Sequence, residues 1–375
     1  MAGIYLHIPF CNKRCTYCDF YTEVAPQFIP QIIDSLIKEI ELRREYLQNA
    51  IINTIYFGGG TPSVLNSEQF SKIFNAIYST FNVDADAEIT FEANPDDLTI
   101  EYLESLQGLP FNRLSIGIQS FNDDDLKQIN RRHNAIQAIE AVQNAQKVGF
   151  ANISIDLIYG LPFQTLESWR NQLDIAVSLN IQHVSAYGLT YEVGTKLYKQ
   201  RENKEFKVVN DDTMNEMYLL LVNKMKENEF EAYEISNFAR KNFRSKHNSS
   251  YWNQDTYMGL GPSAHSYDFI SRQWNVANIG DYIKSIESNE IFWEREELSL
   301  NERYNDFIMV SLRKVEGFEL SFLEQQFGSD LVKYCLNNLK PFIDSNKVNC
   351  ADGKISLTPE GILISNQILI QLMKV

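Results

Sequence analysis

A sixfold alternation of short apolar segments with helix-periodic segments is the feature that most constrains the fold of this 375-residue chain. Helix-length crossovers between successive strands favour parallel strands, so the pattern predicts an α/β fold, a partial parallel (β/α)6 barrel over residues 1–205. The expected strands are 4–9, 54–60, 87–94, 113–119, 152–160 and 183–190. The expected helices include 28–47, 67–80, 134–148 and 165–179.

The second half of the chain has a different pattern. Residues 206–300 are expected to form an extension of the barrel, with a long helix at 211–229 and an aromatic, loop-rich stretch after it. Residues 301–375 alternate short helices with strand-like segments and end in an amphipathic helix expected at 359–373. This pattern predicts a C-terminal α+β extension that ends in a small winged-helix-like unit.

The net charge of −15 and the pI of about 4.9 show that the chain is strongly acidic, which limits the molecules it can bind by charge. Binding to nucleic acid depends on a basic surface that neutralises phosphates, so no nucleic-acid partner is expected. Residues 1–10 lack the basic and apolar regions of a signal peptide, and no apolar run reaches the roughly 20 residues of a membrane span. We therefore expect a cytoplasmic protein with peripheral membrane contact at most.

Three of the five cysteines, Cys11, Cys15 and Cys18, lie in one loop with the spacing C-x3-C-x2-C. Thiolate clusters select zinc or iron–sulfur centres. A structural zinc site needs four protein ligands, whereas an iron–sulfur cube held by three thiolates keeps one iron open for a substrate. The spacing therefore favours a [4Fe–4S] cluster, with a zinc-stabilised binding module as an alternative. Cys335 and Cys350 are interpreted as packing residues.

Polar residues lie at the carboxyl ends of four expected strands. Glu92, Gln119 and Asp156 each end a strand, and glycines 58–60 end another. Ligands of parallel α/β barrels bind at this end, so these groups predict a binding site at one mouth of the barrel.

The cysteine spacing directly after a first strand, together with the glycine loop `GGGTP`, resembles the radical S-adenosylmethionine (SAM) superfamily. Over residues 5–190, `YLHIPFCNKRCTYCDF`, `FEANP` and `IDLIYGLPFQT` resemble the HemN/HemW group of coproporphyrinogen III dehydrogenases and related haem chaperones. The resemblance implies a [4Fe–4S] cluster whose open iron binds SAM. It also implies SAM contacts at Tyr5, Gly59, Gly60, Thr61, Glu92, Gln119, Arg131 and Asp156.

Three features favour the chaperone branch of this group. The dehydrogenase pattern has a further cysteine two residues after the third, where this chain has Phe20. The dehydrogenases also carry a long segment before the cysteine loop, and here Cys11 is the eleventh residue. Finally, `HNSSYW` at 247–252 matches the HNxxYW motif of the chaperones. Oxidative decarboxylation of coproporphyrinogen III is the alternative activity.

The segment 240–252 is basic and aromatic in an otherwise acidic chain. Haem is a flat apolar disc with two carboxylates, so cations, aromatic rings and an imidazole together suit it. The residues alone fit equally a solvated loop whose aromatic rings pack into the core, but the resemblance to the chaperones implies haem binding by this segment, with His247 as iron ligand and His265 as the second choice. By family analogy, haem would pass to an acceptor protein such as a membrane-bound respiratory one. The sequence leaves open whether SAM is consumed and whether the protein forms a homodimer.

Overall fold

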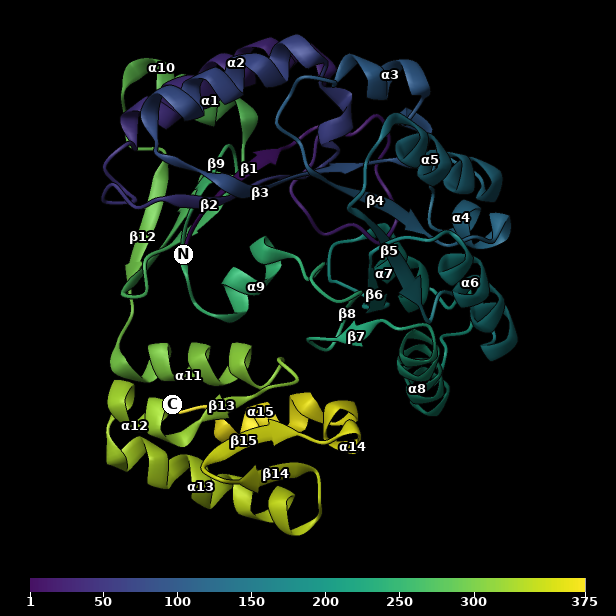
Figure 1. The fold of residues 1–375 in the computed structure, drawn as a ribbon, viewed down its shortest axis with the longest axis vertical. Helices are drawn as coiled ribbons and strands as arrows, with labels where there is room; N and C mark the ends of the chain where they lie inside the picture. Colours follow the sequence, from purple (N-terminus) through teal and green to yellow (C-terminus); the bar gives the residue numbers. More distant parts are fainter. Residues whose placement is uncertain (375) are drawn as a thin grey trace.

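The computed structural model describes residues 1–374. It is built around one curved 12-stranded sheet with the strand order β12-β11-β10-β9-β1-β2-β3-β4-β5-β6-β8-β7. Strands β1 to β6 run parallel, as the strand–helix alternation predicts. Figure 1 shows helices α1 to α6 on the outer side of this sheet and the C-terminal unit below it. The partial parallel barrel is therefore confirmed.

The barrel elements lie close to their predicted positions. The strands are β1 Ala2–Ile8, β2 Ile52–Gly59, β3 Val83–Ala93, β4 Arg113–Gln119, β5 Ile153–Tyr159 and β6 His183–Gly188. The helices are α1 Ile29–Leu42, α2 Ser67–Thr80, α3 Ile100–Ser105, α4 Asp123–Gln128, α5 Ala135–Val148 and α6 Leu166–Ser178. The helix expected at 28–47 ends at Leu42, because the chain then forms turns up to Gln48.

Each barrel strand has one apolar face and one polar face. On β2, Phe57 packs edge-on against Phe70 and Phe74 of the outer helix α2. Its neighbour Tyr56 points to the opposite, concave face and donates a hydrogen bond to Glu92 of β3. Side chains alternate across a strand, so the polar residues of all six strands gather inside the curve of the sheet. A polar lumen of this kind can hold a ligand, unlike the apolar core that fills a closed barrel.

The residues after the barrel extend the same sheet at both edges. The added strands are β7 Glu231–Ala232, β8 Asn237–Ala239, β9 Thr256–Leu260, β10 His265–Tyr267, β11 Ser271–Asn275 and β12 Trp293–Glu297. The helices of this part are α7 Lys196–Glu202, α8 Asp211–Glu227, α9 Lys246–Trp252 and α10 Ile279–Ser288. Strand β9 pairs in parallel with β1, so β1 lies inside the sheet. The predicted boundary at residue 205 stays a prediction.

A buried polar network attaches the added strands to helix α1. Glu39 is fully buried and forms an ion pair with Arg43 at 3.0 Å. Its carboxylate also accepts hydrogen bonds from Asn275 Nδ2 of β11 and from the Tyr282 hydroxyl of α10. Arg43 donates in turn to the Gly259 carbonyl of β9. Because a buried carboxylate is costly unless it is paired, this network favours one docking position for β9 to β11.

The C-terminal unit has its own apolar core, which includes Tyr304, Leu323 and Cys335. Its helices are α11 Leu300–Ser311, α12 Leu320–Phe327, α13 Ser329–Asp344, α14 Pro359–Leu363 and α15 Ser365–Leu372. Its three-stranded antiparallel sheet comprises β13 Phe318–Glu319, β14 Val348–Ala351 and β15 Lys354–Leu357, in the order β13-β15-β14.

Two expectations for this unit are wrong in detail. The single helix expected at 359–373 is two helices, because the backbone leaves helical geometry at Ile364. Cys335 is buried as expected, but Cys350 is exposed on the strand β14. Among residues 1–374, no helix combines the length and the apolar character that crossing a membrane requires.

Candidate functional site

The three cysteines lie in the loop that leaves the carboxyl end of β1, and all three are half-buried. The start of this loop is held by backbone hydrogen bonds from Cys11 N to Glu23 O and from Glu23 N to Pro9 O. The Thr61 hydroxyl donates to Cys11 Sγ at 3.3 Å, and Arg131 Nη1 donates to Cys15 Sγ at 3.4 Å. The structure therefore brings two predicted SAM-site residues into contact with two predicted metal ligands.

This donor set fits an iron–sulfur cube. A cube takes one thiolate per iron, and donors to the sulfur atoms tune the cluster. Thr61 and Arg131 are such donors. Burial raises the pKa of Cys11, and it raises the pKa of Cys18 to about 11. Metal binding to these thiols therefore has to be coupled to loss of their protons. Across residues 1–374, no three His, Cys, Asp or Glu side chains are placed to hold one single metal ion.

The glycine loop at the end of β2 lies directly against the end of β1. Gly59 has a φ of +99°, and a Cβ there would lie 2.5 Å from His7 Nδ1. At Gly60 a Cβ would lie 2.6 Å from the Phe10 carbonyl oxygen. Both positions therefore exclude any side chain. The glycines predicted as SAM contacts also allow the β2 loop to pack onto the base of the cysteine loop.

Two carboxylates face the lumen near this loop. Burial raises the pKa of Glu92 to about 7 and that of Asp156 to about 6, and repulsion from Asp156 adds to the shift of Glu92. Tyr56 donates a hydrogen bond of 2.7 Å to Glu92, which partly offsets the effect of burial. Ser115 lies 3.5 Å from both carboxylate oxygens of Asp156. Buried carboxylates with pKa values near neutrality are typical of a ligand site.

Arg131 and Gln119 lie beside each other at the end of β4. Arg131 Nη2 donates to Asn94 Oδ1 at 2.6 Å and to the Gly117 carbonyl. Gln119 has a φ of +69°, where the pairing of β4 with β5 is shifted. A non-glycine residue in this left-handed region costs of order 1–3 kcal/mol, and such strain is concentrated at binding sites. Tyr5, which faces the same lumen, stacks on Tyr56 with ring centroids 6.2 Å apart.

The structure places His247 deep inside the barrel. Helix α9 enters the concave side of the sheet, as Figure 1 shows, and His247 is 1 % exposed. Its Nδ1 pairs with Thr54 Oγ1 and its Nε2 with the Tyr251 hydroxyl, each at 2.8 Å. The ring stacks on Tyr56 at 4.8 Å. Burial lowers the pKa of His247 to about 3, so the imidazole is neutral and both of its nitrogens have partners.

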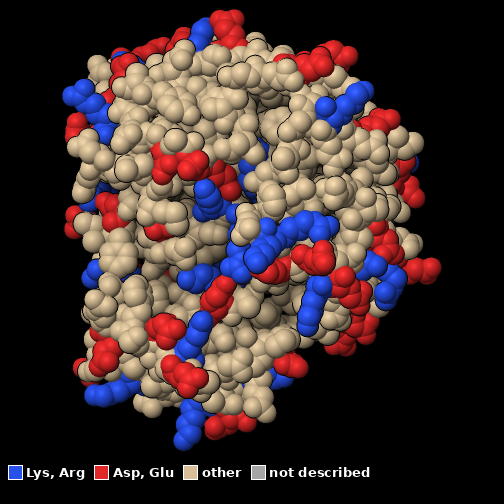
Figure 2. All heavy atoms as spheres, in the orientation of Figure 1, with Lys and Arg blue, Asp and Glu red and all other residues tan. Residues whose placement is uncertain are grey.

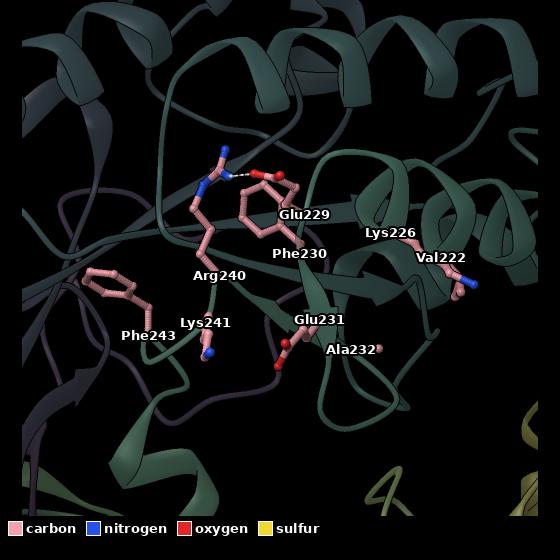
Figure 3. A pocket seen from close by; sticks show the side chains of 9 residues that line it. All are labelled: Val222, Lys226, Glu229, Phe230, Glu231, Ala232, Arg240, Lys241 and Phe243. Atoms are coloured by element: carbon pink, nitrogen blue, oxygen red, sulfur yellow. Dashed lines mark ion pairs between the residues drawn. The ribbon is translucent and has the colours of Figure 1, made fainter.

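The cationic part of the segment 240–252 points elsewhere. A pocket of about 730 Å³ lies beside α8 and β7, and it contains Arg240, Lys241 and Phe243. Figure 3 shows these side chains in the pocket, together with Phe230 and the ion pair between Arg240 and Glu229. The predicted cations and the predicted imidazole therefore do not meet in one site. Figure 2, in the orientation of Figure 1, shows basic side chains gathered across the middle of the visible face of the molecule, with acidic side chains mainly around them.

Sequence reasoning missed three residues that build the lumen: Tyr56, Thr54 and Glu88. Tyr56 links Glu92 to His247, and Thr54 holds the His247 ring. Glu88 accepts hydrogen bonds from the backbone N–H groups of Lys246 and His247 at the start of α9. The available signal was the polar alternation along strands `NTIYFG` and `AEITFEA`, which differs from the continuous apolar runs expected of buried parallel strands.

Known protein families match both halves of the chain. The model of the radical SAM superfamily matches residues 5–175, and the HemN C-terminal domain matches residues 298–364. The solved structure of the coproporphyrinogen III oxidase HemN from Escherichia coli superposes with a TM-score of 0.86, at 24% identity, over 100% of this chain and 90% of that one. The fold is therefore that of a radical SAM protein with a HemN-like C-terminal unit.

The curated relatives define the family more narrowly. "Heme chaperone HemW" of Bacillus subtilis is 33% identical over 98% of each chain. "Heme chaperone HemW" of Buchnera aphidicola subsp. Schizaphis graminum is 38% identical over 77% of this chain and 74% of its own. A mitochondrial radical SAM domain-containing protein 1 of Danio rerio is 35% identical over 70% of this chain and 60% of its own. The chain belongs to the HemW family.

Proposed function

We propose that this protein is a haem chaperone that binds haem and transfers it to an acceptor protein. The observation that carries the proposal is the similarity to relatives named as HemW haem chaperones over nearly the full length of both chains. Phe20, two residues after Cys18, supports it, because the dehydrogenase pattern has a cysteine at that position. Phe20 is 64% exposed and packs into no core.

Cys11, Cys15 and Cys18 would hold the [4Fe–4S] cluster, and the mouth of the barrel would hold SAM. A reduced cluster held there would supply one electron for cleavage of the S–C5′ bond of SAM, which gives methionine and a 5′-deoxyadenosyl radical. Glu92 would accept hydrogen bonds from ribose hydroxyls, and Gly59 and Gly60, which leave no room for a side chain, would let the β2 loop lie close to the methionine part of SAM. Tyr5, Gln119, Arg131 and Asp156 complete the proposed SAM contacts.

We propose a cytoplasmic location with peripheral membrane contact at most, and an acceptor that is a membrane-bound respiratory protein. A homodimer that SAM and the cluster stabilise fits the same role. The assignment of His247 as iron ligand stays a prediction. Iron binding would cost one of its two hydrogen bonds, because the metal would replace either Thr54 at Nδ1 or Tyr251 at Nε2.

The test is a haem titration of the purified protein, followed by its Soret absorption and then by transfer to apo-myoglobin as a neutral acceptor. Saturable binding and transfer that is faster than from free haem in solution are the expected results. The absence of saturable binding would refute the chaperone assignment.

A second function, oxidative decarboxylation of coproporphyrinogen III, is kept because the fold is that of HemN. Anaerobic incubation with SAM, a reductant and coproporphyrinogen III separates the two. Formation of protoporphyrinogen would establish the enzyme, and we expect none. Iron and acid-labile sulfide analysis tests the zinc-stabilised module, which requires zinc and no sulfide.

A further inference from the structure

The five histidines differ in the burial of their rings and in the hydrogen bonds of their ring nitrogens. Four are buried and bonded: His7 to Tyr5 and Tyr21, His133 to Ile118, His183 to Ser154 and Tyr233, and His247 to Thr54 and Tyr251. The ring of His265 is exposed and forms no hydrogen bond with any of residues 1–374. An iron ligand needs an accessible imidazole nitrogen without a hydrogen-bond partner. His265 offers one, whereas the unpaired Nδ1 of His133 is buried.

His265 lies on the concave face of the sheet, next to the proposed SAM site. Strand β9 pairs with β1 so that Gly259 is opposite Tyr5, and both positions face the lumen. A Cβ at Gly259 would collide with the backbone of His265, so β10, which pairs with β9, bends toward the concave side at this point. His265 is also close enough to His7 to contribute to the lowered pKa of His7, although burial is the main cause.

Aromatic side chains surround His265 on the same face. Its ring stacks on Trp274 of β11, with centroids 6.2 Å apart and planes at 29°. Tyr257 and Tyr267 stack next in the row, with centroids 6.3 Å apart. Arg272 lies on this face opposite Tyr267 and is bound to Asp306. Tyr267 is buried, but Trp274 and Tyr257 are partly exposed beside the exposed imidazole, and a flat apolar ring with a central metal fits such a set of side chains.

We propose that His265 is the axial ligand of the haem iron, with Trp274 packed against the imidazole and the aromatic row β9–β11 supporting the porphyrin. This inference rests on the proposed chaperone function. It moves the haem from the segment 240–252 to the open edge of the barrel mouth, where a bound cargo stays accessible to an acceptor. The pocket of Figure 3 is the rival site, and it contains no histidine.

The experiment compares haem titrations of the full-length holo-protein with those of three variants. Two are the single substitutions His265→Ala and His265→Met. The third, the pocket variant, combines Lys241→Glu and Phe243→Ala. Circular dichroism confirms that each variant is folded. We expect His265→Ala to weaken haem binding by at least about tenfold, because even residues behind a metal ligand are worth about 10–100-fold. We expect added imidazole to restore the wild-type Soret spectrum, and His265→Met to bind haem with an altered spectrum that reports a sulfur ligand. The pocket variant should bind as wild type.

The outcomes separate the two proposals. If the wild-type protein binds no haem saturably, the chaperone function fails and the ligand assignment fails with it. If the wild type binds haem and His265→Ala keeps its affinity and spectrum, only the assignment of His265 is overturned. Loss of binding in the pocket variant, with His265→Ala unchanged, would place the haem beside α8 and β7.

Discussion

At the scale of single residues, the state of Glu92 depends on what surrounds its carboxylate. The residue was predictable as a binding group because it ends a strand in a parallel barrel. Its pKa of about 7 was not predictable, because that value comes from burial and from Asp156, which lies on another strand. The same applies to Tyr56, whose hydroxyl holds Glu92 and whose ring stacks on a histidine nearly 200 residues away in sequence.

Binding of SAM is expected to tighten as the pH rises through about 7. The ionised Glu92 carboxylate would accept hydrogen bonds from both ribose hydroxyls, and the protonated form predominates below its raised pKa. If only the ionised form binds, affinity increases about tenfold between pH 6 and pH 8. Equilibrium dialysis with the reconstituted protein measures this change.

Glu92→Gln should bind SAM more weakly and without this pH dependence. The comparison variant is Asp156→Asn, which should keep the pH dependence but move its midpoint below pH 7, because Asp156 raises the pKa of Glu92. A wild-type affinity that does not change from pH 6 to pH 8 would contradict a role for the Glu92 carboxylate.

Replacement of any one of Cys11, Cys15 or Cys18 by alanine should abolish the cluster and SAM cleavage but leave haem binding largely intact. Two thiolates hold a cube poorly, whereas the proposed haem ligand is on a different strand. Iron and sulfide analysis beside a haem titration measures the two effects separately. Cys335→Ala, in the C-terminal core, is the control for loss of a thiol. Equal loss of haem and cluster would mean that the two sites are one.

At the scale of elements, local patterns located most of the fold. Helices with a capping asparagine or threonine, such as α2, α5 and α6, begin within one residue of their predicted start, because the cap is a local signal. Strands β9 to β12 were not predicted. They are short, and β9 and β10 hold their positions through contacts with β1 and α1, which lie more than 200 residues earlier. Their pairing is therefore absent from any local window of sequence.

Helix α9 illustrates a motif whose interpretation depends on its surroundings. The sequence `HNSSYW` predicted a haem-binding segment, and the structure shows a helix whose N-terminus is capped by the buried Glu88 and whose His247 supports Tyr56. An element of seven residues is too short to be stable alone, so tertiary contacts have to hold it.

His247→Ala is therefore expected to destabilise the apo-protein by about 2–4 kcal/mol, because it removes two buried hydrogen bonds and a ring stack and leaves their partners unpaired. Denaturant unfolding followed by circular dichroism measures the change. Asn248→Ala is the matched control on the same helix, since the Asn248 side chain forms no hydrogen bond with residues 1–374 and should cost less than about 1 kcal/mol. Similar losses in both variants would count against the supporting role of the imidazole.

At the scale of the whole molecule, ion pairs join the C-terminal unit to the barrel extension. Arg313 lies 3.2 Å from the fully buried carboxylate of Glu234 and packs over the Trp252 ring at 4.9 Å. Arg244 forms a second pair with Glu316 at 2.7 Å, where both side chains are more than 40% exposed. The Arg313–Glu234 pair has a buried carboxylate, whereas the Arg244–Glu316 pair is exposed to solvent, so the two pairs test how burial affects the contribution of an ion pair to stability.

Arg313→Ala should lower the free energy of unfolding by about 1–3 kcal/mol, because it leaves a buried carboxylate without its cation. Arg244→Ala should cost about 0–1 kcal/mol, since exposed ion pairs contribute little. Thermal unfolding of the two variants at the same pH and salt gives the comparison. An Arg244 effect as large as that of Arg313 would show that burial of Glu234 is not the cause.

The position of β1 between β2 and β9 has a consequence for biosynthesis. The first strand of the chain pairs with Thr256–Leu260, so one of its edges has no partner until about 250 further residues have been made. At about 5–20 residues per second, this interval lasts about 12–50 s on the ribosome. During this time the backbone of β1 is an open strand edge, the kind of edge that pairs with other chains. The nascent protein therefore depends on early protection of its N-terminus, and a chain that stops before residue 256 should aggregate rather than fold.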